Sequence, residues 1–144
     1  MIYVDSSSLL KLLWSEPESS AVIKAVAAEE AVLVSVLTEL ETLVQLKAAW
    51  LGGDYTLPRL RRLETQFAVL RNQPPYEFRA VPSSLFQTAL RQHRNAGDVH
   101  CRSIDRLHLA AMEELDLTRL MTHDDRQAKA AAAAGFEVVR PGRD

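Results

Sequence analysis

MIYVDSSS, residues 1–8, is the stretch from which the fold of this chain can be read. Residues 2–4 form a short apolar run with β-branched members, which is typical of a strand buried on both faces of a parallel sheet. Asp5 follows where such a strand ends, and residues 6–8 offer serine N-caps for the helical pattern that starts at Leu9. Ligands of open α/β sheets bind at the carboxyl ends of the strands. We therefore expect Asp5 to lie at the mouth of an active site.

The composition is that of an ordinary globular protein, with 144 residues of which 47% are hydrophobic and 25% are charged. The length suits one domain, which we expect to span residues 1–144. Cys101 is the only cysteine, so we expect no disulfide framework and no cysteine zinc site, and a reducing cytoplasm is favoured. Charges interrupt the apolar start, which argues against a signal peptide, and no apolar run approaches the ~20 residues of a membrane helix.

The charge pattern bears on possible partners. A formal net charge of −2 argues against nucleic-acid binding by bulk positive charge. Of the 17 basic residues, 13 are arginines, whose guanidinium forks suit phosphate and carboxylate groups. A solvated arginine-rich surface is the alternative explanation for this composition.

Strand and helix patterns alternate along the chain. Further strands are indicated at residues 31–35, 76–81, 119–122 and 137–140. The helical patterns that separate them start near residues 9, 22, 37, 57, 82, 103 and 128. This alternation predicts an α/β fold, a three-layer α/β/α domain with a mostly parallel sheet and helices on both faces.

The helix expected at residues 37–51 is apolar over much of its circumference. One arc holds Leu37, Leu40, Val44, Ala48 and Leu51, and an adjoining arc holds Leu43, Leu46 and Trp50. A helix of this kind is buried by more than one partner. We expect the second arc to contact another helix or a second chain.

Four acidic residues occupy positions near strand ends or the helix starts beside them: Asp5, Glu41, Asp105 and Asp124. Crowded carboxylates repel one another unless a cation joins them. Oxygen ligands without cysteine or paired histidines suit Mg²⁺ or Mn²⁺. On this basis we expect a divalent ion to raise the melting temperature, and Asp105→Asn to stabilise the metal-free protein by relieving repulsion.

Each of these carboxylates also has a structural interpretation. Asp105 can favour the positive start of its helix or pair with Arg102, and Asp124 can cap the next helix. Glu41 can be a solvated residue at the rim of the apolar arc, and Glu39 competes with it for the same role. Asp5 alone, at a strand end, is commonly structural.

Four segments, in this order, resemble the PIN-domain family, and specifically VapC-type ribonuclease toxins of toxin–antitoxin pairs. They are IYVDSS (residues 2–7), SVLTELE (35–41), RSIDRLHLAA (102–111) and MTHDDRQ (121–127). The resemblance covers nearly the whole chain and implies a PIN-like fold with acidic positions at Asp5, Glu41, Asp105 and Asp124. His123 stands where the family more often has an aromatic or other apolar residue.

The hypothesis is a metal-dependent endoribonuclease in which the four carboxylates hold one or two Mg²⁺ or Mn²⁺ ions, with Asp5 and Asp105 as the first candidates for direct ligands. A water activated by the metal would hydrolyse the RNA phosphodiester, so no side-chain nucleophile is needed. The resemblance also implies a homodimer and a small antitoxin partner whose peptide blocks the site. The alternative is a degenerate PIN-like binding module that keeps the fold and a protein partner without catalysis.

Supporting roles fall to several neighbouring side chains. We expect Ser7 and Thr122 to orient carboxylates or water, and His108 to act as a buried supporting group and not as a ligand. Arginines near the acidic centre are expected to position phosphates, with Arg102, Arg106 and Arg126 as candidates.

Overall fold

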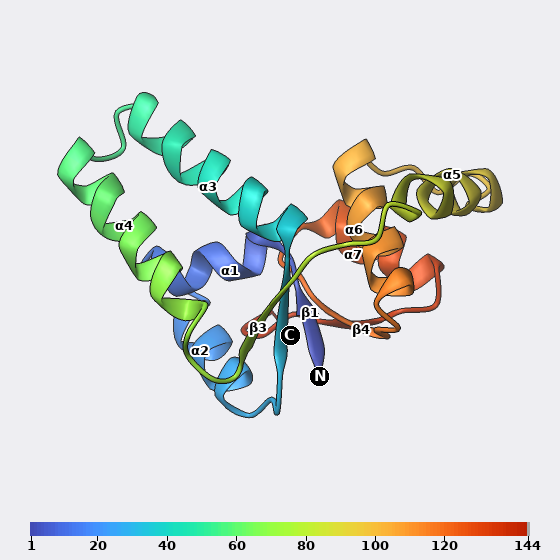
Figure 1. Ribbon diagram of the computed structural model, residues 1–144, viewed down its shortest axis with the longest axis horizontal. Coiled ribbons are helices and arrows are strands. Elements are labelled where there is room, and N and C mark those ends of the chain that lie inside the picture. The colour runs from blue at the N-terminus through green and yellow to red at the C-terminus, as the bar shows by residue number, and fades with distance from the viewer. Residues whose placement is uncertain (144) are drawn as a thin grey trace.

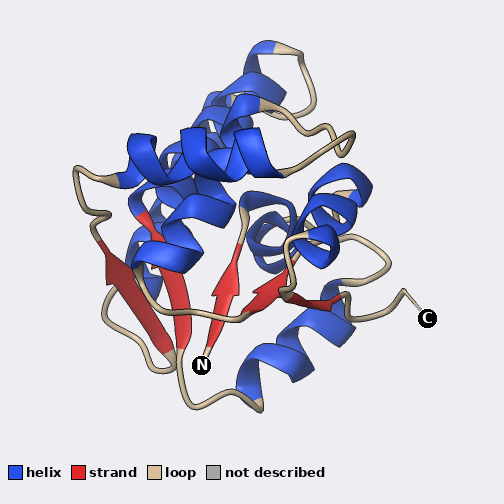
Figure 2. Ribbon diagram, turned by 90° about the vertical axis from the view of Figure 1, so that its right-hand side faces the viewer, coloured by secondary structure: helices blue, strands red, loops and turns tan. Residues whose placement is uncertain are grey.

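A computed structural model of the chain, which describes residues 1–143, has three layers with a sheet in the middle (Figure 1 and Figure 2). Within the described residues the sheet has five strands in the order β3-β2-β1-β4-β5, and every neighbouring pair is parallel. The strands are β1 (Ile2–Val4), β2 (Val32–Ser35), β3 (Tyr76–Arg79), β4 (Arg119–Met121) and β5 (Glu137–Val139).

Helices cover both faces of the sheet (Figure 1). One face carries α1 (Ser6–Leu13), α2 (Ser19–Ala27), α3 (Val36–Leu51) and α4 (Leu57–Leu70). The other face carries α5 (Leu85–Asn95), α6 (Ser103–Glu114) and α7 (Asp125–Ala133). The predicted three-layer α/β/α fold is therefore confirmed, with a sheet that is wholly parallel.

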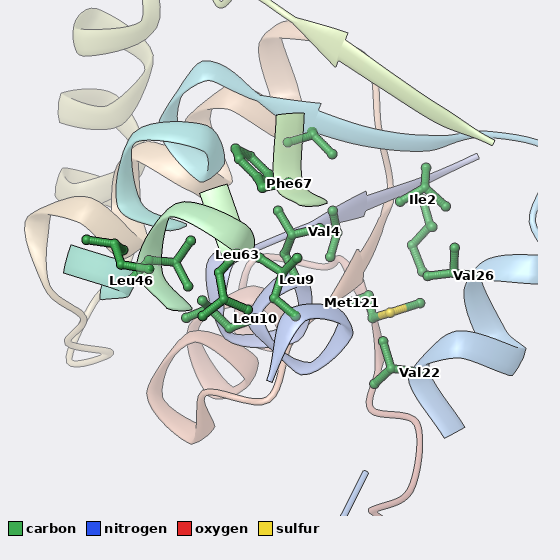
Figure 3. Packing of buried hydrophobic residues seen from close by; sticks show 14 residues of the cluster. Ile2, Val4, Leu9, Leu10, Val22, Val26, Leu46, Leu63, Phe67 and Met121 are labelled. Atoms are coloured by element: carbon green, nitrogen blue, oxygen red, sulfur yellow. The ribbon is translucent and has the colours of Figure 1, made fainter. Parts of the chain in front are cut away.

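The side chains of β1 explain why its sequence is an unbroken apolar run. Ile2 and Val4 point into the core formed with α1 to α4, whereas Tyr3 points into the core formed with α5 to α7. Figure 3 shows Ile2 and Val4 among side chains from α1, α2, α3 and α4. All three β1 residues are fully buried, because the strand has helices on both sides.

The element boundaries agree with the predictions to within a few residues at most ends. The last helix begins at Asp125, about three residues earlier than its alanine-rich run indicated, because the Asp124 side chain caps it. The predicted domain ends at residue 144, which lies outside the described residues, and its extent stays a prediction. Among residues 1–143, no helix is long and apolar enough to cross a membrane.

The two apolar arcs of α3 have different surroundings. Leu46 is fully buried, and Leu43 and Trp50 pack against the same core, so the predicted contact of this arc with other helices is found. In the other arc, Leu40 is 61% and Leu51 is 67% exposed. The prediction of burial by more than one partner is thus fulfilled on one side of the helix only.

The strand order fixes where a site can form. The chain runs outward from β1 to β2 and β3 on one side, and β4 and β5 lie on the other side. This reversal next to β1 is the switch point at which α/β sheets open a crevice. The Asp5 N–H donates to the Met121 carbonyl over 3.2 Å, so the residues that follow β1 and β4 lie side by side.

Candidate active site

Asp5 is buried, and hydrogen bonds hold both oxygens of its carboxylate. The residue is 4% exposed, and its Oδ1 accepts hydrogen bonds from the Ser7 hydroxyl at 2.6 Å and the Ser8 N–H at 3.1 Å. Asp5 is therefore the N-cap of α1, and the prediction that one of the three serines caps this helix was wrong. The Asp5 carboxylate satisfies the free N–H of the helix start more favourably because it is charged.

Thr122 holds the other oxygen of Asp5 and connects it to Asp124. The Thr122 hydroxyl donates to Asp5 Oδ2 and accepts from the Asp124 N–H at 3.1 Å. Burial raises the pKa of the Asp5 carboxyl, and the hydrogen bonds from Ser7 and Thr122 act in the opposite direction. The predicted role of Ser7 and Thr122 in orienting a carboxylate thus matches their contacts.

Asp105 and Asp124 are joined by a single guanidinium. Arg102 Nη2 lies 3.0 Å from Asp105 Oδ1 and 2.9 Å from Asp124 Oδ2, and Arg102 Nε lies 2.9 Å from Asp105 Oδ2. The Arg102 N–H also donates to Asp105 Oδ2 at 3.0 Å. Arg102 is the N-cap residue of α6.

These contacts change the expected energetics of the metal-free site. Asp105 hydrogen-bonds to Arg102, which raises the pKa of the guanidinium, with Asp124 and Glu41 adding to the effect. When a cation already offsets the charge of a carboxylate, replacing that carboxylate with a neutral amide removes a favourable contact and relieves no repulsion. The expectation that Asp105→Asn stabilises the metal-free protein was therefore wrong in its premise, since it assumed carboxylates paired only with one another.

Glu41 reaches the same region from α3. The Ser6 hydroxyl donates to Glu41 Oε1, and His108 Nε2 lies 3.6 Å from the same oxygen. Burial raises the pKa of the Glu41 carboxyl, but the nearby His108 imidazole and the hydrogen bond from Ser6 outweigh it, so the pKa is lowered overall. Glu39, its competitor, instead pairs with Arg71 of the α4 end. The geometry thus brings Glu41, and not Glu39, to the site.

A hydrogen bond to the Tyr3 hydroxyl holds the His108 ring in place. The Tyr3 hydroxyl lies 2.7 Å from His108 Nδ1 and 2.6 Å from the Ser35 hydroxyl, and all three side chains are buried. This network leaves His108 Nε2 facing Glu41. His108 therefore has the buried supporting position that the sequence predicted.

Two of the four predicted acidic residues, Glu41 and Asp124, line a cleft of about 280 Å³, whereas Asp5 and Asp105 are buried and are not part of its lining. Its lining includes Ser6, Ser7, Glu41, Arg102, His123 and Asp124. As they stand, no three histidine, cysteine, aspartate or glutamate side chains among residues 1–143 are arranged to hold a metal ion. The donor set consists of carboxylate and hydroxyl oxygens, which is the chemistry that Mg²⁺ and Mn²⁺ require, so the residues fit such an ion.

His123 has a structural role at the edge of this cleft. Its Nε2 lies 2.9 Å from the Pro141 carbonyl, which can only accept, so Nε2 carries the proton and Nδ1 accepts from the Ser8 hydroxyl at 2.8 Å. Burial lowers the pKa of the imidazole and keeps it neutral. Ser8 is fully buried, so this serine–histidine pair cannot act as a nucleophile on a substrate in the cleft.

Two of the three candidate arginines lie elsewhere. Arg106 is buried beside a separate pocket of about 250 Å³ between α5, α6 and α7. It follows Asp105 directly in α6, and consecutive helix residues point about 100° apart, so its side chain points in a different direction from that of Asp105. Arg126 is exposed in the first turn of α7 and is not part of the cleft lining. Of these three arginines, only Arg102 reaches the acidic centre. It contacts Asp105, as one alternative in the sequence analysis had it, and also Asp124, a contact that the sequence did not indicate.

The model of the PIN domain family matches residues 2–133, which is most of the chain. The chain belongs to the PIN-domain family. Among its relatives are proteins of Mycobacterium tuberculosis named ribonuclease VapC47, with 30% identity over 99% of this chain and 98% of the relative, and ribonuclease VapC35, with 32% identity over 99% and 98%. The predicted family is thereby confirmed.

Solved PIN-type structures confirm the fold. The Mycobacterium tuberculosis toxin VapC20, described as cleaving the sarcin-ricin loop, superposes with a TM-score of 0.73 at 19% identity, covering 98% of this chain and 100% of that one. FitAcB from Neisseria gonorrhoeae gives a TM-score of 0.75 at 15% identity, covering 100% of both chains. PIN-domain ribonucleases of the VapC type generally depend on a divalent metal.

The Tyr3 network behind the PIN-domain site generates a stability prediction. Tyr3→Phe leaves the buried His108 Nδ1 and the Ser35 hydroxyl short of a partner, so we expect it to lower the free energy of unfolding by about 1–3 kcal/mol. Urea unfolding measures the change. Tyr76→Phe is the matched control. Burial alone, with no hydrogen-bond contribution, raises the pKa of Tyr76, so its hydroxyl has no such network to lose. This variant should lower the free energy of unfolding by less than about 0.5 kcal/mol. Equal costs for the two variants would contradict the network.

Proposed function

We propose that this PIN-domain protein is a metal-dependent endoribonuclease of the VapC type and the toxin of a toxin–antitoxin pair. The observation that carries the proposal is the gathering of acidic side chains from four segments at the carboxyl edge of the sheet, where Thr122 links Asp5 to Asp124 and Arg102 links Asp124 to Asp105. The names of its relatives support an RNA substrate. A free Cys101 and an RNA substrate fit a cytoplasmic location.

The acidic residues would hold Mg²⁺ or Mn²⁺ through Asp5, Glu41, Asp105 and Asp124, directly or through water. When bound, the ion lowers the pKa of a water and offsets charge on the phosphate. The protein's own contribution is to fix the oxygen donors. Ser7 and Thr122 hold both oxygens of Asp5, and Ser6 with His108 directs Glu41 into the same cleft. Hydrogen bonds of this kind orient the carboxylates that would bind the ion.

The exposed arc of α3 supports the proposed homodimer. Val36, Leu40 and Val44 are each 45–61% exposed and follow one another at intervals of four residues, so they form an apolar stripe along one face of the helix. An apolar stripe of this kind, on a helix whose opposite side is already in the core, is typical of a contact between chains. We propose that a second copy of the chain covers it, while the antitoxin covers the acidic cleft.

The nuclease function is tested with purified, metal-loaded protein and bulk RNA. Asp5→Asn should reduce Mn²⁺-dependent cleavage at least about a hundredfold, because it removes a charged ligand of the ion. The matched control is Asp125→Asn, which removes the same charge next to Asp124 but from an exposed side chain that pairs with Arg140 and Arg143. Its activity should stay within about twofold of the unmodified protein. If the unmodified protein cuts no RNA, the degenerate binding module replaces the nuclease.

The homodimer is tested by sedimentation. Leu40→Glu/Val44→Glu places two charges in the proposed contact and should convert a dimer into a monomer at micromolar concentration. Ile23→Glu/Val69→Glu makes the same charge change on the exposed sides of α2 and α4 and should leave the dimer intact. A monomeric unmodified protein, or a dimer that survives the α3 substitutions, would contradict the proposed contact.

A further inference from the structure

Arg102 occupies the position in which a cation would be expected. Its guanidinium contacts both oxygens of Asp105 and one oxygen of Asp124, over distances of 2.9–3.0 Å. Asp105 comes from the first turn of α6 and Asp124 from the segment after β4, so one side chain joins carboxylates from two separate parts of the fold. The positive charge of Arg102 offsets the repulsion that these carboxylates would otherwise feel.

We propose that Arg102 is a built-in counter-cation of the acidic site, and that a divalent ion must displace its guanidinium from Asp105 and Asp124 in order to bind. This inference rests on the proposed metal-dependent function. Both oxygens of Asp105 are already engaged by Arg102, and a hard divalent cation binds through the same lone pairs. The guanidinium and the metal ion therefore compete for one set of atoms.

The Arg102 side chain is half exposed, at 51%, whereas the Asp105 carboxylate is buried, with only 5% of the side chain exposed. If the guanidinium leaves, Asp105 Oδ2 still accepts from the Arg102 backbone N–H at 3.0 Å. Asp124 Oδ1 still accepts from the Gln127 N–H at 2.8 Å. Displacement thus exchanges one cation for another around oxygen atoms that backbone contacts keep in place.

The other cations of the cleft are engaged elsewhere. Lys11 lies 2.7 Å from Glu16 and 2.9 Å from Glu18, and Arg143 contacts Glu18 and Asp125 at 3.3 Å. Both side chains line the same cleft as Arg102, but the carboxylates that they contact are not the proposed ligands. Arg102 is therefore the cation whose removal should change the metal affinity most.

Competition of this kind lowers the apparent affinity for metal. The metal ion would bind only the form in which the Arg102 guanidinium has left the carboxylates. Its apparent affinity is therefore the intrinsic affinity multiplied by the fraction of protein in that form. Arg102 thus stabilises the metal-free site at the expense of metal binding, and it sets the metal concentration at which the site fills.

The inference is tested by titrating Mn²⁺ into metal-stripped protein in a calorimeter. Arg102→Gln should bind Mn²⁺ about tenfold more tightly than the unmodified protein, because no guanidinium has to leave. Arg143→Gln is the matched control, since it removes the same charge from the same cleft without touching Asp105 or Asp124. Its affinity should change by less than about threefold, which separates displacement from a general gain in negative charge.

A second measurement uses the unmodified protein and does not depend on the folding of a variant. The Nε–H resonance of Arg102 in an NMR spectrum reports its hydrogen bond to Asp105, and it should shift on addition of Mg²⁺ while that of Arg143 does not. Equal Mn²⁺ affinity, or weaker binding, in Arg102→Gln would overturn the inference while leaving the metal-dependent function standing. No Mn²⁺ binding by any of the three proteins would overturn both.

Discussion

The carboxylate of Asp5 is a negative charge buried at the end of a central strand, and the rest of the site depends on how it is held there. A buried carboxylate is costly unless hydrogen bonds compensate it. The hydroxyls of Ser7 and Thr122 and the N–H of Ser8 supply this compensation. Because Thr122 follows β4 and Ser7 lies in α1, satisfying Asp5 also fixes the two neighbouring segments of the crevice. The same contacts therefore stabilise the fold locally and position the functional groups.

The sequence predicted much of the fold because its signals are local. Continuous apolar runs such as residues 2–4 are typical of strands covered on both sides, and helical patterns between them leave few possible topologies. The four carboxylates could be nominated for a similar reason, since strand ends and helix starts can be located from the sequence. Their convergence followed from the parallel order of the strands and needed no knowledge of side-chain contacts.

Other features depended on contacts between distant residues, and the sequence did not determine them. The arcs of α3 look alike in composition, but the position of α1 and α4 buries Leu46 and leaves Leu40 exposed. Arg106 and Arg102 were equal candidates for phosphate contacts, and the direction of each side chain from α6 separates them. The cap of the first helix was assigned to a serine, although Asp5 fills this position. A carboxylate that belongs to the site can thus also serve as a helix cap.

The PIN-domain assignment and the contacts of Arg102 together describe an acidic site that the chain neutralises with its own cation. Like charges gathered from separate segments would oppose folding if nothing joined them. The exposed guanidinium of Arg102 offsets this repulsion between the carboxylates in the folded chain without any bound ion or RNA.

Anomalous diffraction from crystals soaked in Mn²⁺ will show whether these carboxylates form one divalent-cation site. An anomalous peak at the manganese absorption edge is expected beside the cleft, within coordination distance of Asp5 and Asp105 or of the waters bound to them. A peak at another place on the molecule, with none beside the cleft at saturating Mn²⁺, would contradict a shared site.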